Sequence, residues 1–246
     1  MDLRPSRRRI FAGALFDEQY GQIYASATRW RDETAHAMHS IEALDASTGH
    51  KVWETDCPGS PCELVGRSVA VVEWRQQVQL LEVVLLDRQN GTMSRRFQLR
   101  LPAWTALPGA HITITEARAE DQTLKIFWHG VATYAGGAPP PREIEAAARR
   151  NESGGFALDV ESGKAHPLES GEMTGMPPAS FIHPPSHPIE ESTTFELDER
   201  TEEAQGKLPQ GSRTVTLVAK DRHSGRVLWR HKLRDLVWRP PPPPPP

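Results

Sequence analysis

Two pairs of residues stand at spacings that suit metal or thiol chemistry. Cys57 and Cys62 flank a short Pro-Gly-Ser-Pro loop. A disulfide across the loop is geometrically conceivable, but reduced thiols are the default expectation. Two thiols are half of a structural zinc site, and the chain has no other cysteines. His183 and His187 are separated by prolines, which forbid the helical turn that would bring the two imidazoles together. We therefore expect no metal site.

The sequence lacks the local patterns that mark common catalytic centres. It contains no Gly-x-Ser-x-Gly nucleophile elbow, no glycine-rich phosphate loop and no His-Glu-x-x-His helix pattern. The adjacent carboxylates Glu190-Glu191 and Glu202-Glu203 lie in polar stretches, which is typical of a solvated surface. A Ser/His/Asp arrangement stays open, because counting residue types cannot exclude one. We predict no catalytic residue and no cofactor, and the sequence favours a protein that is not an enzyme.

A turn motif recurs four times and organises the chain. Each copy reads Asp-x-x-(Ser/Thr/Asn)-Gly and follows an apolar run; the end residues are Asp45 and Gly49, Asp87 and Gly91, Asp159 and Gly163, and Asp221 and Gly225. The Asp carboxylate can accept hydrogen bonds from nearby backbone amides, and the Gly can adopt the positive φ of a hairpin turn. Alternating Asp/Asn ligands of a calcium loop are absent. Four copies predict a repeat architecture.

The first and fourth copies carry a resemblance to a known repeat. Residues 43–53 and 220–229 resemble the tryptophan-docking motif of the pyrroloquinoline-quinone-like β-propeller repeats. In that family the motif joins the third and fourth strands of a blade, and its Trp packs against the neighbouring blade. The resemblance implies that Trp53 and Trp229 are blade-docking aromatics. Arg95 and Pro167 stand at the equivalent positions of the other two copies, so regular docking is not expected there.

The repeat predicts an all-β fold, a β-propeller of about four blades, each a four-stranded antiparallel sheet. It forms one domain over residues 1–239, with units at roughly 9–57, 58–102, 103–170 and 171–235. Arg9 to Phe16 is expected to form the first strand. In the fourth unit, strands are expected early only at 180–182 and 193–197. Four units can close alone or pair with a second chain, so the protein is a monomer or a dimer.

Two segments depart from the repeat. Residues 142–150 predict a short helix inserted in the third unit, with acidic residues early and arginines late, as suits the helix dipole. The run of seven prolines, 240–246, predicts an extended polyproline tail outside the domain. The quinone-dependent dehydrogenases of the resembling family have eight blades, calcium ligands and a disulfide between adjacent cysteines. Here the cysteines are not adjacent, so the quinone site is expected to be absent.

Composition and charge narrow the possible partners. The net charge is −3, with 29 basic and 32 acidic residues, which gives no electrostatic footprint for nucleic acid or an anionic membrane. No run approaches the ~18 apolar residues of a membrane span. The basic start at Arg7-Arg8-Arg9 precedes an apolar segment too short for an export signal. We predict a cytoplasmic protein.

Two functional hypotheses follow from the sequence. The leading one is a non-catalytic β-propeller scaffold that presents loops to a protein partner, with contacts at 132–153, at 169–212 and in the tail, since loops on a rigid frame carry recognition. The alternative is a small-molecule-binding protein or quinoprotein-like enzyme with a site in the central channel.

Overall fold

The computed structural model describes residues 7–11, 13–31, 36–107, 109–132, 151–169, 188–190, 192–203 and 211–238. Over these residues the backbone is mainly β-strand, with the one-turn 3-10 helices η2 (Gln76–Val78) and η3 (Ala103–Ala106) and no α-helix. The all-β prediction is therefore confirmed. The helix predicted over 142–150, the histidines at 183 and 187, the strand expected at 180–182 and the proline tail all lie outside the described residues.

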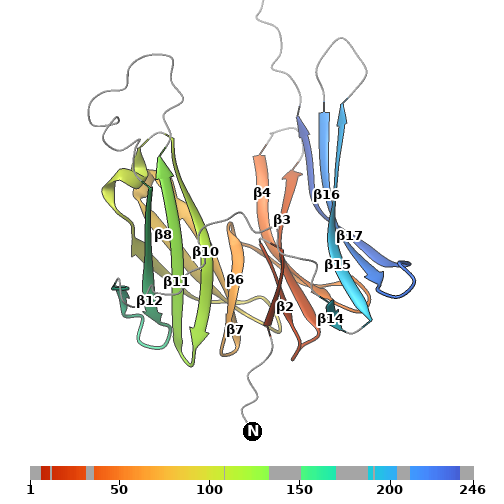
Figure 1. Cartoon of the computed structure of the whole chain (residues 1–246), viewed down its shortest axis with the longest axis horizontal. Coiled ribbons are helices and arrows are strands. Elements are labelled where there is room, and N and C mark those ends of the chain that lie inside the picture. Colours follow the sequence, from red (N-terminus) through yellow and green to blue (C-terminus); the bar gives the residue numbers. More distant parts are fainter. Residues whose placement is uncertain are drawn as a thin grey trace, which may run out of the picture. The chain divides into compact units, whose positions relative to one another are not determined.

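The strands, in chain order, are β1 (Arg7–Phe11), β2 (Ala14–Asp17), β3 (Gln22–Arg31), β4 (His36–Asp45), β5 (Lys51–Asp56), β6 (Ser60–Val65), β7 (Ser68–Arg75), β8 (Leu80–Asp87), β9 (Met93–Arg100), β10 (Ala110–Glu120), β11 (Thr123–Ala132), β12 (Asn151–Asp159), β13 (Ala165–Pro167), β14 (Pro188–Glu190), β15 (Thr193–Glu203), β16 (Gly211–Asp221) and β17 (Val227–Trp238). They are coloured along the chain in Figure 1.

The chain divides into two compact units. The first combines residues 1–60 with 183–246, and the second spans 61–182. In Figure 1 the second unit runs from yellow to green, and the first holds the red, orange and blue strands. The single domain expected over 1–239 stays a prediction.

A four-stranded meander, in which each strand pairs with the next, occurs four times. The four sets are β2 to β5, β6 to β9, β10 to β13 and β14 to β17. In each set the Asp-x-x-x-Gly turn joins the third strand to the fourth. Because successive strands alternate in direction, the first and third connections of a meander lie at one end of its sheet. The second connection lies at the opposite end.

The four turns share one hydrogen-bond pattern. In the first, Asp45 Oδ1 accepts from the amides of Ser47 at 3.0 Å and Thr48 at 2.8 Å. The Gly49 amide donates to the Asp45 carbonyl at 2.8 Å, and Gly49 has φ of +72°. The other three turns repeat these contacts, with Gly φ values of +72°, +74° and +68°. Glycine is required here because L side chains disfavour that region.

Each turn is also tied to the turn beside it. The amide after each Asp donates to a carbonyl in the connection between the first two strands of the same meander. The pairs are Ala46 to Gly21, Arg88 to Arg67, Val160 to Gln122 and Arg222 to Ser192, at 2.8 to 3.0 Å. The two tight connections of every meander are therefore locked together at one end of the sheet.

In the first unit, the outer meanders of the chain share one sheet. β17 pairs in parallel with β3 through Arg234 opposite Thr28 and Asp235 opposite Arg29. Chain segments far apart in sequence then enclose a common core, which is built of Ala14, Phe16, Ile23, Ala25, Leu44, Phe195, Leu217, Ala219, Trp229 and Leu233. Burial of these apolar side chains supplies the main driving force for joining the two ends of the chain.

In the second unit, two meanders enclose a large common apolar core. The continuous run from Leu81 to Leu86 in β8 is buried throughout, as expected for a strand covered on both faces. Leu81, Val83 and Leu85 of this run pack in a cluster with Leu124, Ile126 and Trp128 of β11 and Leu158 of β12. Trp104 of η3 lies in the same cluster, so the connection between the two meanders is anchored in the core.

Two strand predictions were wrong. The single strand expected from Arg9 to Phe16 is a hairpin, in which β1 pairs with β2 and Arg9 lies opposite Leu15. Gly13, at φ of +88°, reverses the chain there. The strand expected to end at Leu197 continues to Glu203, with Arg200 opposite Thr214. Its polar residues gain cross-strand partners, including an ion pair of Arg213 with Glu199 at 2.5 Å.

The turn carboxylates make stability depend on pH. Hydrogen bonds from Ser47 hold the pKa of Asp45 below its ordinary value, and bonds from Ser162 and Ser224 do the same for the pKa of Asp159 and of Asp221. A lowered folded-state pKa gives stability that is present above the unfolded value of about 3.9 and is lost as pH falls through the folded value.

We therefore expect the free energy of unfolding to fall below about pH 4, and to fall less steeply in a triple variant with Asp45→Asn, Asp159→Asn and Asp221→Asn. Asn keeps the side-chain acceptor but carries no charge. Urea unfolding followed by circular dichroism between pH 3 and pH 6 measures the slopes, with Asp56→Asn, at an exposed position of β5, as the matched control. Equal slopes in the triple variant and the wild type would contradict the expectation.

Candidate functional site

The first candidate site is the contact between the fourth meander and the turn of the first. The indole of Trp229 in β17 lies over Gly49, so that a Cβ on this glycine would meet the ring carbon Cδ2 at 2.6 Å. The Nε1 atom of the indole donates a hydrogen bond to the Ala46 carbonyl at 3.0 Å. Phe195 packs against the same indole, with ring centroids 5.6 Å apart. Gly49 thus serves both the turn and the close approach of the ring.

An equivalent contact in the second unit uses different residues. Arg95 in β9 donates through Nη1 to the Val160 carbonyl at 2.7 Å and also to the carbonyl of Glu161. Phe97, two residues further along β9, lies 3.3 Å from the position of a Cβ on Gly163. Val160 follows its turn Asp as Ala46 follows Asp45. Arg95 and Phe97 together therefore make the two contacts that Trp229 makes alone.

A β-bulge aims these side chains. In the first, second and fourth meanders, the pairing of the third and fourth strands shifts by one residue near the turn. The extra residues are Val52, Ser94 and Leu228, and each immediately precedes Trp53, Arg95 or Trp229. In the third meander the described pairs run from Leu158–Ala165 to Phe156–Pro167 without a shift. A bulge bends its strand and turns the next side chain.

The aromatics named from the sequence have different surroundings. Trp229 covers the turn of another meander, as described above. Trp53 is buried and stacks on Tyr24 of its own meander, with ring centroids 5.7 Å apart. A docking role for Trp53 stays a prediction. Arg95, which the sequence places at the Trp position without a docking role, makes the equivalent backbone contact.

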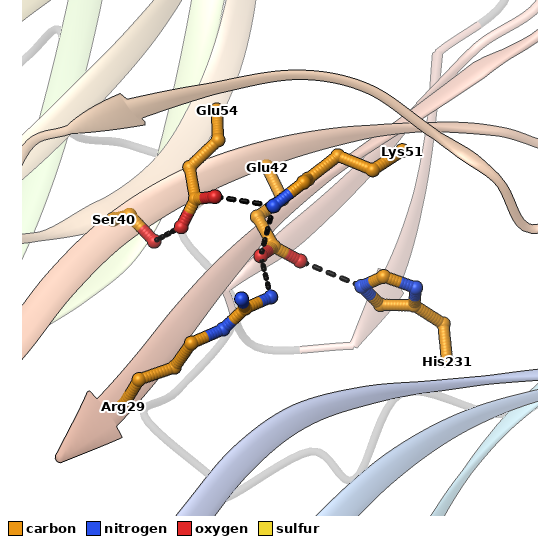
Figure 2. A network of polar contacts seen from close by, with 6 residues as sticks. All are labelled: Arg29, Ser40, Glu42, Lys51, Glu54 and His231. Carbon is orange, nitrogen blue, oxygen red and sulfur yellow. Dashed lines mark hydrogen bonds and ion pairs between the residues drawn. The ribbon is translucent and has the colours of Figure 1, made fainter. Parts of the chain in front are cut away.

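A second candidate site is a network of charges around the buried carboxylate of Glu42 in β4 (Figure 2). His231 of β17 contacts it through Nε2 at 2.6 Å, across 189 residues of chain. Arg29 of β3 forms an ion pair with Oε1, and Lys51 of β5 lies 3.7 Å from the same oxygen. Side chains from three other strands therefore converge on one carboxylate of β4, and one of these strands, β17, belongs to a different meander.

Glu54 extends this network towards solvent. Its carboxylate accepts a hydrogen bond from Ser40 Oγ at 2.9 Å and pairs with Lys51. Burial raises the pKa of Glu54, but the hydrogen bonds from Lys51 and Ser40 and the charge of Arg29 outweigh it and lower the pKa overall. A buried carboxylate is costly unless it is paired, and this arrangement pairs it from several sides. The network therefore fixes the junction between β4 and β17.

The second unit contains a similar buried carboxylate. Glu82 in β8 pairs with Arg75 of β7 at 2.5 Å and with Arg96 of β9 at 2.9 Å. Neither carboxylate belongs to a motif that the sequence marks. The available signal was a single Glu inside an apolar third strand just before a turn, as in Ile41-Glu42-Ala43 and Leu81-Glu82-Val83.

Cys57 and Cys62 are both buried thiols, and Cys57 Sγ lies 3.6 Å from the Pro58 carbonyl. Across the described ranges, no group of three or more His, Cys, Asp or Glu could hold a metal ion. In the same part of the chain, no helix has the length and apolarity needed to cross a membrane.

Comparisons with known proteins assign this chain to no family. No family model matches the sequence, and no curated protein matches it. Among solved structures, the N-terminal domain of Nup159 matches with a TM-score of 0.31 and 10% identity. The match covers 89% of this chain and spans 60% of the length of that domain. A TM-score this low carries no weight for fold or function.

The contact of Arg95 with the third turn should contribute to stability. We expect Arg95→Ala to lower the free energy of unfolding by about 1 kcal/mol, because it removes charge-assisted hydrogen bonds to a partly exposed carbonyl. Arg100→Ala, at an exposed position of β9, is the control and should change the free energy of unfolding by less than about 0.5 kcal/mol. Urea unfolding measures both. An Arg95→Ala effect no larger than that of Arg100→Ala would contradict a docking role for the guanidinium.

The Glu42 network should be more sensitive at its centre than at its rim. We expect Glu42→Gln to cost about 2 kcal/mol, because it leaves Arg29, Lys51 and His231 facing a neutral amide, although Arg29 and Lys51 can turn to solvent. Glu54→Gln, at a carboxylate that is 28% exposed, should cost less than about 1 kcal/mol. Denaturation midpoints of the two variants test the order, and equal losses would show that Glu42 is not the centre.

Proposed function

We propose that this chain is a β-propeller-type repeat protein, in which the four meanders are four blades, and that it is a non-catalytic scaffold for a protein partner. The observation that carries the proposal is the repetition of one four-stranded meander with the same Asp turn between its third and fourth strands. Such radial repetition is typical of propellers, whose loops are used for recognition.

The direction of the docking contacts supports a ring. β9 of the second meander contacts the turn of the third, and β17 of the fourth contacts the turn of the first. Both contacts run from one meander to its successor, with the fourth followed by the first. If the first meander contacts the turn of the second in the same way, and the third that of the fourth, the four meanders form a closed ring. The indole over Gly49 also supports the kinship with quinoprotein-type repeats that the motif suggests.

We place the recognition surface at the sheet ends opposite the Asp turns. The second connection of a meander lies at that end, and it is long in the third meander, where residues 133–150 separate β11 from β12. Residues 204–210 are the corresponding connection, from β15 to β16, and β13 also ends at that end of its sheet. The connections at the Asp-turn end of each sheet are short, whereas the connections at the opposite end vary in length. This division matches a rigid frame with one adaptable face.

The experiment compares capture of partners by the wild type and by a variant in which residues 133–150 are replaced by a short Gly-Asn linker. We expect a partner that copurifies with the wild type to be lost from the variant, while the unfolding temperature is unchanged. Removal of residues 240–246 is the matched control and should leave capture intact. The protein used is the full chain in both cases.

Two results would overturn the proposal. One is capture of the same partner by the variant lacking 133–150 and by further variants with 170–187 or 204–210 shortened. The other is a rise of several degrees in unfolding temperature with a quinone, sugar or divalent ion. Linkage predicts such a rise for a true ligand near a hundredfold excess over its Kd, and it would favour a small-molecule site instead.

A further inference from the structure

Two strands share one edge of β3. β4 pairs with the opposite edge along its whole length, from Gln22 to Arg31. On the shared edge β2 pairs only from Gln22 to Ala25, and β17 continues the pairing at Thr28 and Arg29. Without β17, this part of β3 would present unpaired backbone groups, and such an edge is a template for a further strand. The first meander therefore offers a place for one added strand.

Two side chains of β17 identify the strand that fits this place. The indole of Trp229 lies over Gly49 and donates to the Ala46 carbonyl at 3.0 Å. Two residues further, His231 Nε2 lies 2.6 Å from the buried carboxylate of Glu42 (Figure 2). Alternate residues of a strand point to the same face, so a strand with the pattern Trp-x-His makes both contacts at once. The pattern occurs once in the sequence, in β17, so the partner that this place selects is the fourth meander of this chain.

The receiving meander and the strand that it binds are far apart in the chain. The first lies in residues 1–60 and the second in residues 183–246, and the whole second unit separates them in sequence. The contacts are non-covalent, so none of them depends on which chain supplies β17. Residues 170–187 lead to the fourth meander, and a segment of this length spans up to about 60 Å when extended. That reach lets the fourth meander of one chain meet the first meander of another.

We propose that the first meander is a binding surface for the fourth meander of a second copy, and that two chains exchange these meanders to form a reciprocal dimer. In the dimer, residues 1–60 of each chain are completed by residues 183–246 of the other. Each junction then holds the indole on Gly49, the imidazole beside Glu42 and the added strand on β3. No contact of the single chain is lost, which is why exchange of identical elements is an accessible route to dimers. The exchanged surface is separate from the long connections assigned above to recognition of a different protein.

Concentration decides between the closed chain and the dimer. Within one chain, a flexible linker holds the two meanders at an effective concentration on the order of millimolar. Exchange therefore competes when the protein itself approaches that concentration. Reopening either form requires the apolar core that contains Phe16, Leu217 and Leu233 to come apart, so the form that is made first persists after dilution. Chains that fold while crowded together are expected to keep their exchanged partners.

Refolding of the wild-type chain at two concentrations is the first test. The protein is unfolded in urea, refolded at about 1 mM or about 1 µM, and diluted to one concentration for size-exclusion chromatography with light scattering. A reducing agent keeps Cys57 and Cys62 as thiols. We expect a dimer of twice the 27.5 kDa chain mass after refolding at the higher concentration and the monomer after refolding at the lower one.

Two complementary variants are the decisive test. Glu42→Lys places a cation beside Arg29, and His231→Glu places a second carboxylate beside Glu42. Each variant alone therefore has like charges in its junction, whereas an exchanged pair of the two has one native junction and one with a reversed ion pair. We expect the two variants refolded together at about 20 µM to give at least about tenfold more dimer than the wild type at the same concentration.

The matched control carries both substitutions, Glu42→Lys and His231→Glu, in one chain. Its reversed ion pair forms within the chain, so it should give no more dimer than the wild type. Where a single variant does not fold alone, circular dichroism of the mixture answers the same question. β-structure that appears only when the two variants are refolded together supports exchange, and its absence contradicts it.

Three results would each contradict the inference. They are a monomer from the wild type refolded at the higher concentration, no dimer from the mixed variants, and a dimer that His231→Glu alone forms as readily as the mixture does. In the last case another surface would hold the two chains together. Partner capture that depends on residues 133–150 is unaffected by any of these results, so failure here and failure of the scaffold proposal are distinguishable.

Discussion

The contact between a side chain of one meander and the turn of the next is the interaction on which this architecture depends. A single meander leaves the apolar side chains of its sheet exposed to water, and it is stable only when a neighbouring sheet covers them. Packing alone would let neighbouring sheets slide. The hydrogen bond from Trp229 to the Ala46 carbonyl and the seating of the indole on Gly49 fix one position. The indole can lie this close to the turn because Gly49 has no side chain.

Buried charge supports the same junction by a different principle. Glu42 gains little net energy from burial, because desolvation offsets much of its attraction to Arg29 and His231. It instead specifies how the surrounding strands are arranged, because a buried carboxylate is stable only where hydrogen-bond donors surround it. Any other placement of β17 would leave Glu42 without His231. Indole packing therefore supplies stability, and the carboxylate excludes alternative arrangements.

Local chemistry made the turns predictable from the sequence, whereas the contact that Arg95 makes with a turn was not predictable. An Asp, a hydroxyl or amide residue and a Gly at fixed offsets determine a turn within five residues, and all four copies adopt it. The role of Arg95 depends on a β-bulge and on a carbonyl 65 residues away, neither of which the sequence marks. The split of the first strand depends on one glycine, Gly13, whose conformation apolar patterning does not reveal.

The shared sheet of the outer meanders has a consequence for synthesis. Residues 61–182 are contiguous and emerge from the ribosome as a complete unit, whereas residues 1–60 need residues 183–246 to finish theirs. Until β17 is translated, the nascent chain carries β3 without its parallel neighbour and Phe16 without the apolar cover that Leu217 and Leu233 provide. The apolar residues of β2 and β3 are thus made well before the strands that cover them, and they stay exposed to solvent until β17 is translated.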